Sequence, residues 1–209
     1  MPKTRAARAV LLGSILALCS LSSLSWASDK GKALYALCSS CHGFKGEGNE
    51  AVGAPVIDGL PEWYLITQLV KFKDGIRAGH PRDLYGHKMR PMARSLTEED
   101  IKIVSAYVAA RPKPAVKETV QGRIVDGEAK FQVCVACHGT KAEGNQNLGA
   151  PPLAGANDWY LLRQLKNFKG KVRGGDPTRD VFGGQMQGIS AALDDDAMVN
   201  VVTYINSLK

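Results

Sequence analysis

Two copies of one five-residue motif contain the residues of this 209-residue chain that are best suited to chemistry. The copies are Cys38-Ser39-Ser40-Cys41-His42 and Cys134-Val135-Ala136-Cys137-His138. On a helical turn, positions i, i+3 and i+4 share one face, so two thiols can bond one porphyrin while the adjacent imidazole reaches its iron. C-x-x-C-H is the attachment pattern of c-type haem. The motifs therefore predict two covalent haem c groups, held by these four cysteines, with His42 and His138 as axial iron ligands.

Two other interpretations of the cysteine pairs are a zinc site with four thiolate ligands and a pair of redox dithiols. Neither interpretation explains why a histidine follows the second cysteine in both copies. The 96 residues from Cys38 to Cys134 also exceed the usual spacing within a zinc motif. Covalent haem is therefore the favoured hypothesis.

The amino-terminal segment, 1–27, has the parts of a secretory signal peptide. Its basic residues are Lys3, Arg5 and Arg8, its apolar stretch is 10–24, and its small-residue cleavage site is Ser25-Trp26-Ala27. We predict cleavage after Ala27 and a mature protein in the periplasm. An uncleaved anchor is the alternative, but the apolar stretch is shorter than the roughly 20 residues that a membrane span needs. Leu18 before Cys19 disfavours lipidation, which prefers a small residue there.

The charge of the chain does not indicate a nucleic-acid partner. The formal net charge is +7, but three of the 27 basic residues belong to the leader, and 20 acidic residues oppose the remaining 24. Two haems would add four propionates, which brings the mature protein close to neutrality. No basic stripe with interleaved aromatic residues is present in the sequence.

The two motifs belong to a longer internal repeat. At an offset of 96 residues, 55–59 (P-V-I-D-G) matches 151–155 (P-P-L-A-G), and W-Y-L at 63–65 matches W-Y-L at 159–161. After one inserted residue near Thr178 the offset becomes 97, and Met89 then matches Met186. The repeat predicts duplicated domains at 28–110 and 123–209.

The segment between the domains begins with Arg111-Pro112-Lys113-Pro114, which cannot continue a helix because proline lacks the amide N–H. We predict a linker over 111–122. Within each half, apolar residues at helical spacing predict an opening helix, a middle helix over 62–73 or 158–169, and a last helix that begins near Thr97 or Asp194. The predicted fold is all-α.

The second axial ligand is expected to recur in both halves. Candidates in the first half are His80, His87, Met89 and Met92. Only Met89 has a counterpart of the same type, Met186, and both are expected in a glycine-containing loop seven residues before a leucine. Met92 is the fallback. Ligation by His and Met raises the haem potential and leaves no open coordination position, which favours electron transfer over chemistry on a substrate.

Other repeated residues suggest supporting roles. The carbonyls of Pro55 and Pro151 are expected to accept from the Nδ1–H of His42 and His138 and so orient the rings, although simple turn roles are equally plausible. Arg82 and Arg179 are candidates for neutralising haem propionates, with solvated surface charge as the default.

This pattern resembles the class I cytochromes c and, in its duplication, the dihaem cytochrome c4 family. The resemblance rests on C-x-x-C-H after an opening helix, P-x-[IL]-x-G, the W-Y-L-x-x-Q-L-x-x-F helix and the methionine before the final helix. It implies two haem domains related by an approximate two-fold axis, propionates meeting near the interface, and electron delivery in the periplasm, often to a terminal oxidase. The stretch 75–83 departs from the pattern and has no assigned role.

The leading functional hypothesis is a soluble dihaem electron carrier that is not an enzyme. Its expected partners are membrane-bound respiratory complexes: a quinol-oxidising complex or dehydrogenase as donor, and a terminal oxidase or reductase as acceptor. No nucleic acid and no small-molecule substrate are expected. The alternatives are a dihaem enzyme, either a peroxidase or a thiosulfate-oxidising cytochrome, and a dedicated electron-accepting subunit of a periplasmic dehydrogenase.

Overall fold

The computed structural model describes residues 28–208, in which every regular element is a helix. The predicted leader, 1–27, and Lys209 lie outside the described residues. The first half contains a helix over 28–42, η1 (Glu50–Val52), α2 (Glu62–Lys73), α3 (Gly86–Arg94) and α4 (Glu98–Ala109). The second half repeats this order with α5 (Ile124–His138), η2 (Gln146–Leu148), α6 (Asp158–Lys169), α7 (Val181–Ala191) and α8 (Asp195–Ser207). The predicted all-α fold is confirmed.

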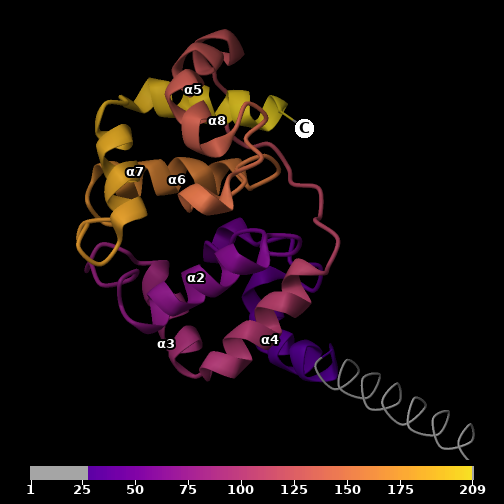
Figure 1. The fold of residues 1–209 in the computed structure, drawn as a ribbon. Helices are drawn as coiled ribbons and strands as arrows, with labels where there is room; N and C mark the ends of the chain where they lie inside the picture. The colour runs from indigo at the N-terminus through magenta and orange to yellow at the C-terminus, as the bar shows by residue number, and fades with distance from the viewer. Residues whose placement is uncertain (1–27, 209) are drawn as a thin grey trace, which may run out of the picture.

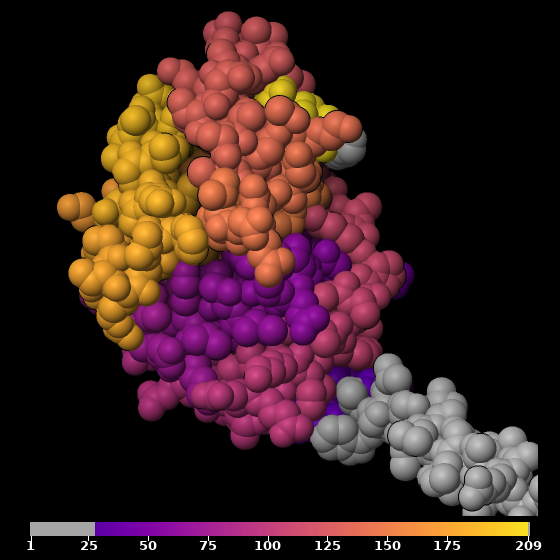
Figure 2. All heavy atoms as spheres, in the orientation of Figure 1, coloured from indigo at the N-terminus to yellow at the C-terminus, as the bar shows by residue number. Residues whose placement is uncertain are grey.

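The two halves are stacked, with α2 and α6 toward the junction and the connecting segment running along one side (Figure 1). The two halves meet along a continuous band of atoms in Figure 2. Asn157 Oδ1 accepts from the backbone N–H of Val56 at 2.6 Å, and Arg163 donates to the Gly53 carbonyl at 2.7 Å. From 28 to 208, no helix is long and apolar enough to cross a membrane.

Each half is held together where its first and last helices cross. A Cβ at Gly127 would lie 2.0 Å from the carbonyl oxygen of Asn200, so only glycine allows α5 and α8 to approach this closely. Next to this crossing, the rings of Phe131 and Tyr204 have centroids 5.4 Å apart. Gly31 lies against Tyr107 in the same way in the first half. The first and last helices therefore cross closely in both halves.

The predicted middle helices agree with α2 and α6 at both ends. Thr97 begins the last helix of the first half with a capping box to Asp100, and Asp194 caps α8 by accepting from the Ala197 N–H. The prediction of loops around Met89 and Met186 was wrong, because both residues lie in short helices, α3 and α7. Glycine and proline weaken helix propensity there.

The first turns of α3 and α7 are stabilised from outside the helix. The carboxylates of Asp83 and Asp180 accept from the N–H groups of Gly86 and Gly183 at 3.0 and 2.9 Å. A buried acid three residues upstream therefore allows a weak helical sequence to form the helix that carries each methionine.

Hydrogen bonds to Asp158 hold the connecting segment against the second half. The carboxylate of Asp158 is fully buried and accepts from the backbone N–H groups of Thr119 and Val120 and from Asn206 of α8. Burial alone would raise the pKa of Asp158, but these hydrogen bonds outweigh it and hold the pKa below its ordinary value. The folded state therefore favours the ionised form.

Replacing Asp158 by Asn is expected to lower the unfolding free energy at pH 7 by about 2 kcal/mol, the size of hydrogen bonds to a charged acceptor. Because the folded pKa is depressed, this contribution is complete above pH ~5 and is lost as the pH falls through ~4 and below. The difference between wild type and variant should shrink over that window in denaturant titrations. Glu62→Gln, at the exposed equivalent position in the repeat, is the control and should change stability little at either pH. A difference that does not depend on pH would contradict this account of Asp158.

Candidate functional site

The first C-x-x-C-H motif lies at the end of the helix over 28–42. Cys38 is half-buried, Cys41 is exposed and His42 is buried, and all three line one pocket together with Met89 of α3. His42 and Met89 are 47 residues apart in the sequence, and the fold brings both side chains to one pocket. Two thiols, an imidazole and a thioether are thus gathered around one space.

The walls of this pocket are mainly apolar. They include Leu34, Leu65, Leu69, Phe72, Val104 and Val108. Toward the second half the lining becomes polar, with Tyr64, Gln68 and Arg77 from the first half and Tyr160, Arg163 and Gln164 from the second. The pocket therefore has an apolar body and one polar end at the junction of the halves.

Each motif histidine is oriented by a backbone carbonyl. The Nδ1 atoms of His42 and His138 lie 2.7 and 2.8 Å from the carbonyl oxygens of Pro55 and Pro151, which confirms the contact expected from the repeat. Burial lowers the pKa of both histidines and so favours the neutral ring. With Nδ1–H donated to the carbonyl, Nε2 retains the lone pair that an iron ion requires.

The structure discriminates among the four candidates for the second ligand in the first half. Met89 and Met92 line the pocket, whereas His80 and His87 do not. Met89 also packs against the buried cluster of Phe72, Ala78 and Ala93, while Met92 is 37% exposed. Met89 is thus the better anchored of the two sulfur atoms.

In the second half, Cys134, Cys137 and His138 form the last turns of α5, and Met186 is half-buried in α7. The equivalence of Met186 to Met89 rests on the repeat and on the matching helices α3 and α7. The same four donor types therefore occur at equivalent positions in both halves.

The surroundings of the cysteines also bear on the alternative of reactive dithiols. Neither cysteine pair forms a disulfide, and across 28–208 no group of three or more His, Cys, Asp or Glu side chains is placed to hold a metal ion. Burial raises the pKa of Cys38, and raises that of Cys134 to about 11. Reactive dithiols require the opposite shift.

The residues present fit a haem c group. The donor set provides two thioether-forming thiols and two axial atoms, and the apolar walls suit the porphyrin face. At the polar end of the pocket, the Nε of Arg77 is buried and has no hydrogen-bond partner among the described atoms. A buried guanidinium donor of this kind suits a carboxylate of the haem.

One cluster beside the first motif was missed by sequence reasoning. The buried carboxylate of Asp58 pairs with Arg111 Nε at 2.5 Å, and Arg111 also donates to the hydroxyl of Tyr107 at 3.1 Å and to the Phe44 carbonyl at 2.5 Å. A comparison of the two halves of the repeat could have revealed this cluster. Asp58 and Arg111 are charged, whereas the residues at the equivalent positions of the second half, Ala154 and Leu208, are apolar and cannot form an ion pair. An ionic cluster thus supports one domain only.

Arg82 and Arg179 are exposed, as the default of a solvated surface charge expects, and each also contacts the opposite half. Arg82 donates to the Gly170 carbonyl at the end of α6, and Arg179 donates to the Asp74 carbonyl at the end of α2. Each arginine therefore caps the middle helix of the opposite half, where a positive charge complements the helix dipole.

Comparison with known proteins gives the same pattern. The family model described as cytochrome c matches 28–111 and, separately, 124–209. A cytochrome c4 from Pseudomonas aeruginosa is 29% identical over 95% of this chain and 98% of its own length. A thiosulfate dehydrogenase electron acceptor from Thiomonas intermedia is 32% identical over 78% of each chain.

A solved structure of similar architecture is that of reduced recombinant cytochrome c4 from Pseudomonas stutzeri, with a TM-score of 0.66 and 26% identity. The alignment covers 85% of this chain and 96% of that one. Two family matches, two C-x-x-C-H motifs and a shared two-domain architecture lead to one assignment. The chain belongs to the cytochrome c family, as a tandem pair of cytochrome c domains that binds two haem c groups and carries electrons.

Proposed function

We propose that this protein is a periplasmic electron carrier between respiratory complexes, with axial pairs His42/Met89 and His138/Met186. It would accept electrons from a quinol-oxidising complex or a dehydrogenase and deliver them to a terminal oxidase or reductase. The observation that carries the proposal is the pocket lined jointly by Cys38, Cys41, His42 and Met89. A site with both axial positions filled leaves no position for a substrate.

The proposal includes the domain limits 28–110 and 123–209, the linker over 111–122, and export directed by 1–27 with cleavage after Ala27. Bound haem supplies one-electron chemistry. The protein's own residues then have three tasks. Pro55 and Pro151 hold the histidine rings by their Nδ1–H groups, the methionine sulfurs favour the reduced iron, and the apolar walls exclude water.

A second candidate function is the role of dedicated acceptor for a periplasmic dehydrogenase. It is favoured by the similarity to a protein named as the electron acceptor of thiosulfate dehydrogenase. This role uses the same two domains and differs only in the donor.

The test follows the absorbance of the oxidised two-haem protein with three donors: quinol with membranes that contain a quinol-oxidising complex, thiosulfate with a thiosulfate dehydrogenase, and thiosulfate alone. The proposal expects rapid reduction of both haems by the first donor and reoxidation by oxidase-containing membranes. Rapid reduction by the second donor alone would favour the acceptor role instead. Rapid turnover of thiosulfate or peroxide by the isolated protein would show that it is an enzyme.

A further inference from the structure

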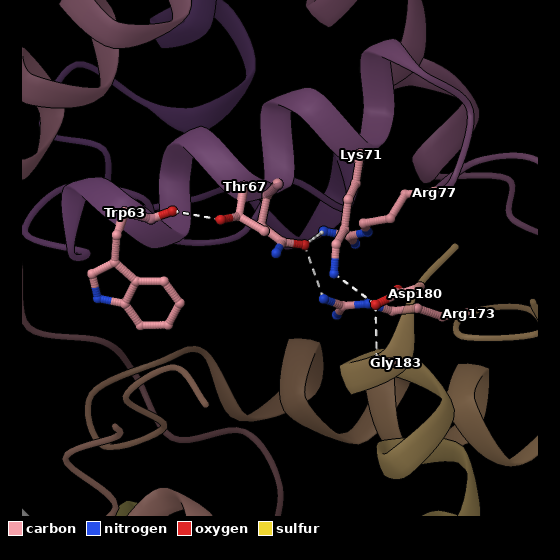
Figure 3. Close-up of polar contacts among 8 residues, drawn as sticks. Trp63, Thr67, Lys71, Arg77, Arg173, Asp180 and Gly183 are labelled. Carbon is pink, nitrogen blue, oxygen red and sulfur yellow. Dashed lines mark hydrogen bonds and ion pairs between the residues drawn. The ribbon is translucent and has the colours of Figure 1, made fainter. Parts of the chain in front are cut away.

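Lys71 of the first half forms an ion pair with Asp180 of the second half. Lys71 lies in the last turn of α2, and its Nζ is 2.6 Å from the Oδ1 of Asp180. Figure 3 shows Lys71 reaching from α2 to Asp180 at the start of α7. The two side chains are only 17% and 5% exposed, so salt screens this pair less than a pair on the surface.

The carboxylate that Lys71 contacts also begins the helix that carries Met186. Asp180 is the N-cap residue of α7, and its Oδ1 accepts from the backbone N–H of Gly183 at 2.9 Å. The first turn of α7, 181–184, contains two glycines, which weaken a helix. Met186 lies in the turn that follows. A single carboxylate oxygen thus joins Lys71 of one half to the methionine helix of the other.

The charge of Lys71 supports the ionised form of Asp180. Burial alone would raise the pKa of Asp180, but the hydrogen bonds from Lys71 and Gly183 and the charges of Lys71 and Arg173 hold the pKa below its ordinary value. An ionised carboxylate is a stronger acceptor for a backbone N–H than a neutral one. Without Lys71, the buried carboxylate would lose its ion-pair partner, which destabilises the cap.

The first half has no equivalent of this contact. Asp83 matches Asp180 in the repeat and caps α3 through the N–H of Gly86 at 3.0 Å. None of the ion pairs within 28–208 includes Asp83, and the residue that matches Lys71 is the uncharged Asn167. The dependence therefore runs in one direction, from the first half to the methionine helix of the second.

We propose that Lys71 of the first half is a positioning residue for Met186, the sulfur ligand of the second haem. This inference rests on the proposed axial pair His138/Met186. Local opening of a helix end is governed by the contacts that hold it. Loss of the Lys71 contact lets the first turn of α7 open more often, and the sulfur then leaves the iron more often. The sulfur ligand of the first haem, Met89, keeps its own cap and is not affected.

The experiment follows the binding of imidazole to the oxidised two-haem protein as loss of the methionine-ligation band. Imidazole can bind an iron only where the methionine has left. Lys71→Gln is expected to accelerate this loss at one haem on the order of tenfold, the factor for one hydrogen bond to a charged group. The other haem should react as in wild type. Because the band that remains in Met89→Ala belongs to Met186, Lys71→Gln in that background identifies the affected haem as the second.

Two variants serve as controls. Arg179→Gln is matched in position, since Arg179 precedes Asp180 and also donates across the junction, but it is exposed and bonds the Asp74 carbonyl. It should leave both rates near wild type. Lys71→Arg keeps a cation at the position and should recover most of the wild-type rate, which a loss of general packing would not explain.

Faster loss at the first haem, equal acceleration at both haems, or the same acceleration in Arg179→Gln would overturn the inference. If Lys71→Gln disturbs the fold, Asp180→Asn tests the contact from its other side and should accelerate the same haem. Wild type without the methionine band would refute the proposed ligands. An intact band with unchanged rates in both Lys71→Gln and Asp180→Asn would refute only the role of Lys71.

Discussion

Met89→Ala is expected to remove about half of the methionine-ligation band of the oxidised protein and to lower one of its two midpoint potentials. The reason is that a neutral thioether favours ferrous iron, and its loss leaves water or a stronger donor in its place. A fall of roughly 0.2 V is consistent with the ~0.8 V range over which axial ligands set haem potentials. The other haem, with Met186, should keep its band.

Two matched variants test this assignment. Met186→Ala should give the same spectral loss with a fall in the other potential. Met92→Ala removes the other methionine that lines the first pocket, and it should leave the spectrum and both potentials near wild type. If Met92→Ala loses the band and Met89→Ala keeps it, the ligand of the first haem is Met92. Retention of the full band in all three variants would refute methionine ligation from α3 and α7.

Arg111→Ala is expected to lower the unfolding free energy of the first domain by about 3–5 kcal/mol, the range for breaking a buried ion pair from one side. The carboxylate of Asp58 is 1% exposed, and its Oδ1 already has no hydrogen-bond partner among the described residues. Removing Arg111 leaves that charge buried and unpaired. Denaturant unfolding of the two-haem protein, followed at the haem absorbance, measures the loss.

The second domain provides the control for this prediction. The double variant Asp58→Ala/Arg111→Leu installs the residues that occupy the equivalent positions, Ala154 and Leu208. Replacing both members of a buried ion pair by apolar residues is often close to neutral, so the double variant should recover most of the stability that Arg111→Ala loses. A double variant as unstable as Arg111→Ala would show that the lost stability comes from other contacts of Arg111, such as those with Tyr107 and Phe44.

The sequence predicted the helices whose own residues favour a helix. The apolar spacing in 62–73 was sufficient to predict α2, and Thr97 with Asp100 predicted the start of α4. The methionine helices α3 and α7 were not predicted, because their own sequences are rich in glycine or interrupted by Pro91. They depend on Asp83 and Asp180, which the fold buries.

Contacts between distant segments could not be read from local sequence. Asp58 and Arg111 are 53 residues apart, and Arg173 and Gln68 are 105 residues apart. The stretch 75–83, which had no assigned role, supplies Arg77 and Arg82 to the junction. Its sequence is explained only when both halves are placed together. The repeat did contain part of this information. Gln68 and Arg77, which lie at the junction, have identical residues at the equivalent positions of the second half, whereas Asp58 and Arg111 of the ionic cluster do not.

The most direct test of the central claim is a redox titration of the exported protein with a visible spectrum at each step. Two domains that each hold one haem between a histidine and a methionine predict two one-electron steps. They also predict an oxidised spectrum with the methionine band at the strength of two haems, and slow binding of carbon monoxide by the reduced protein. A single step, an absent band, or rapid carbon monoxide binding at both haems would contradict the account.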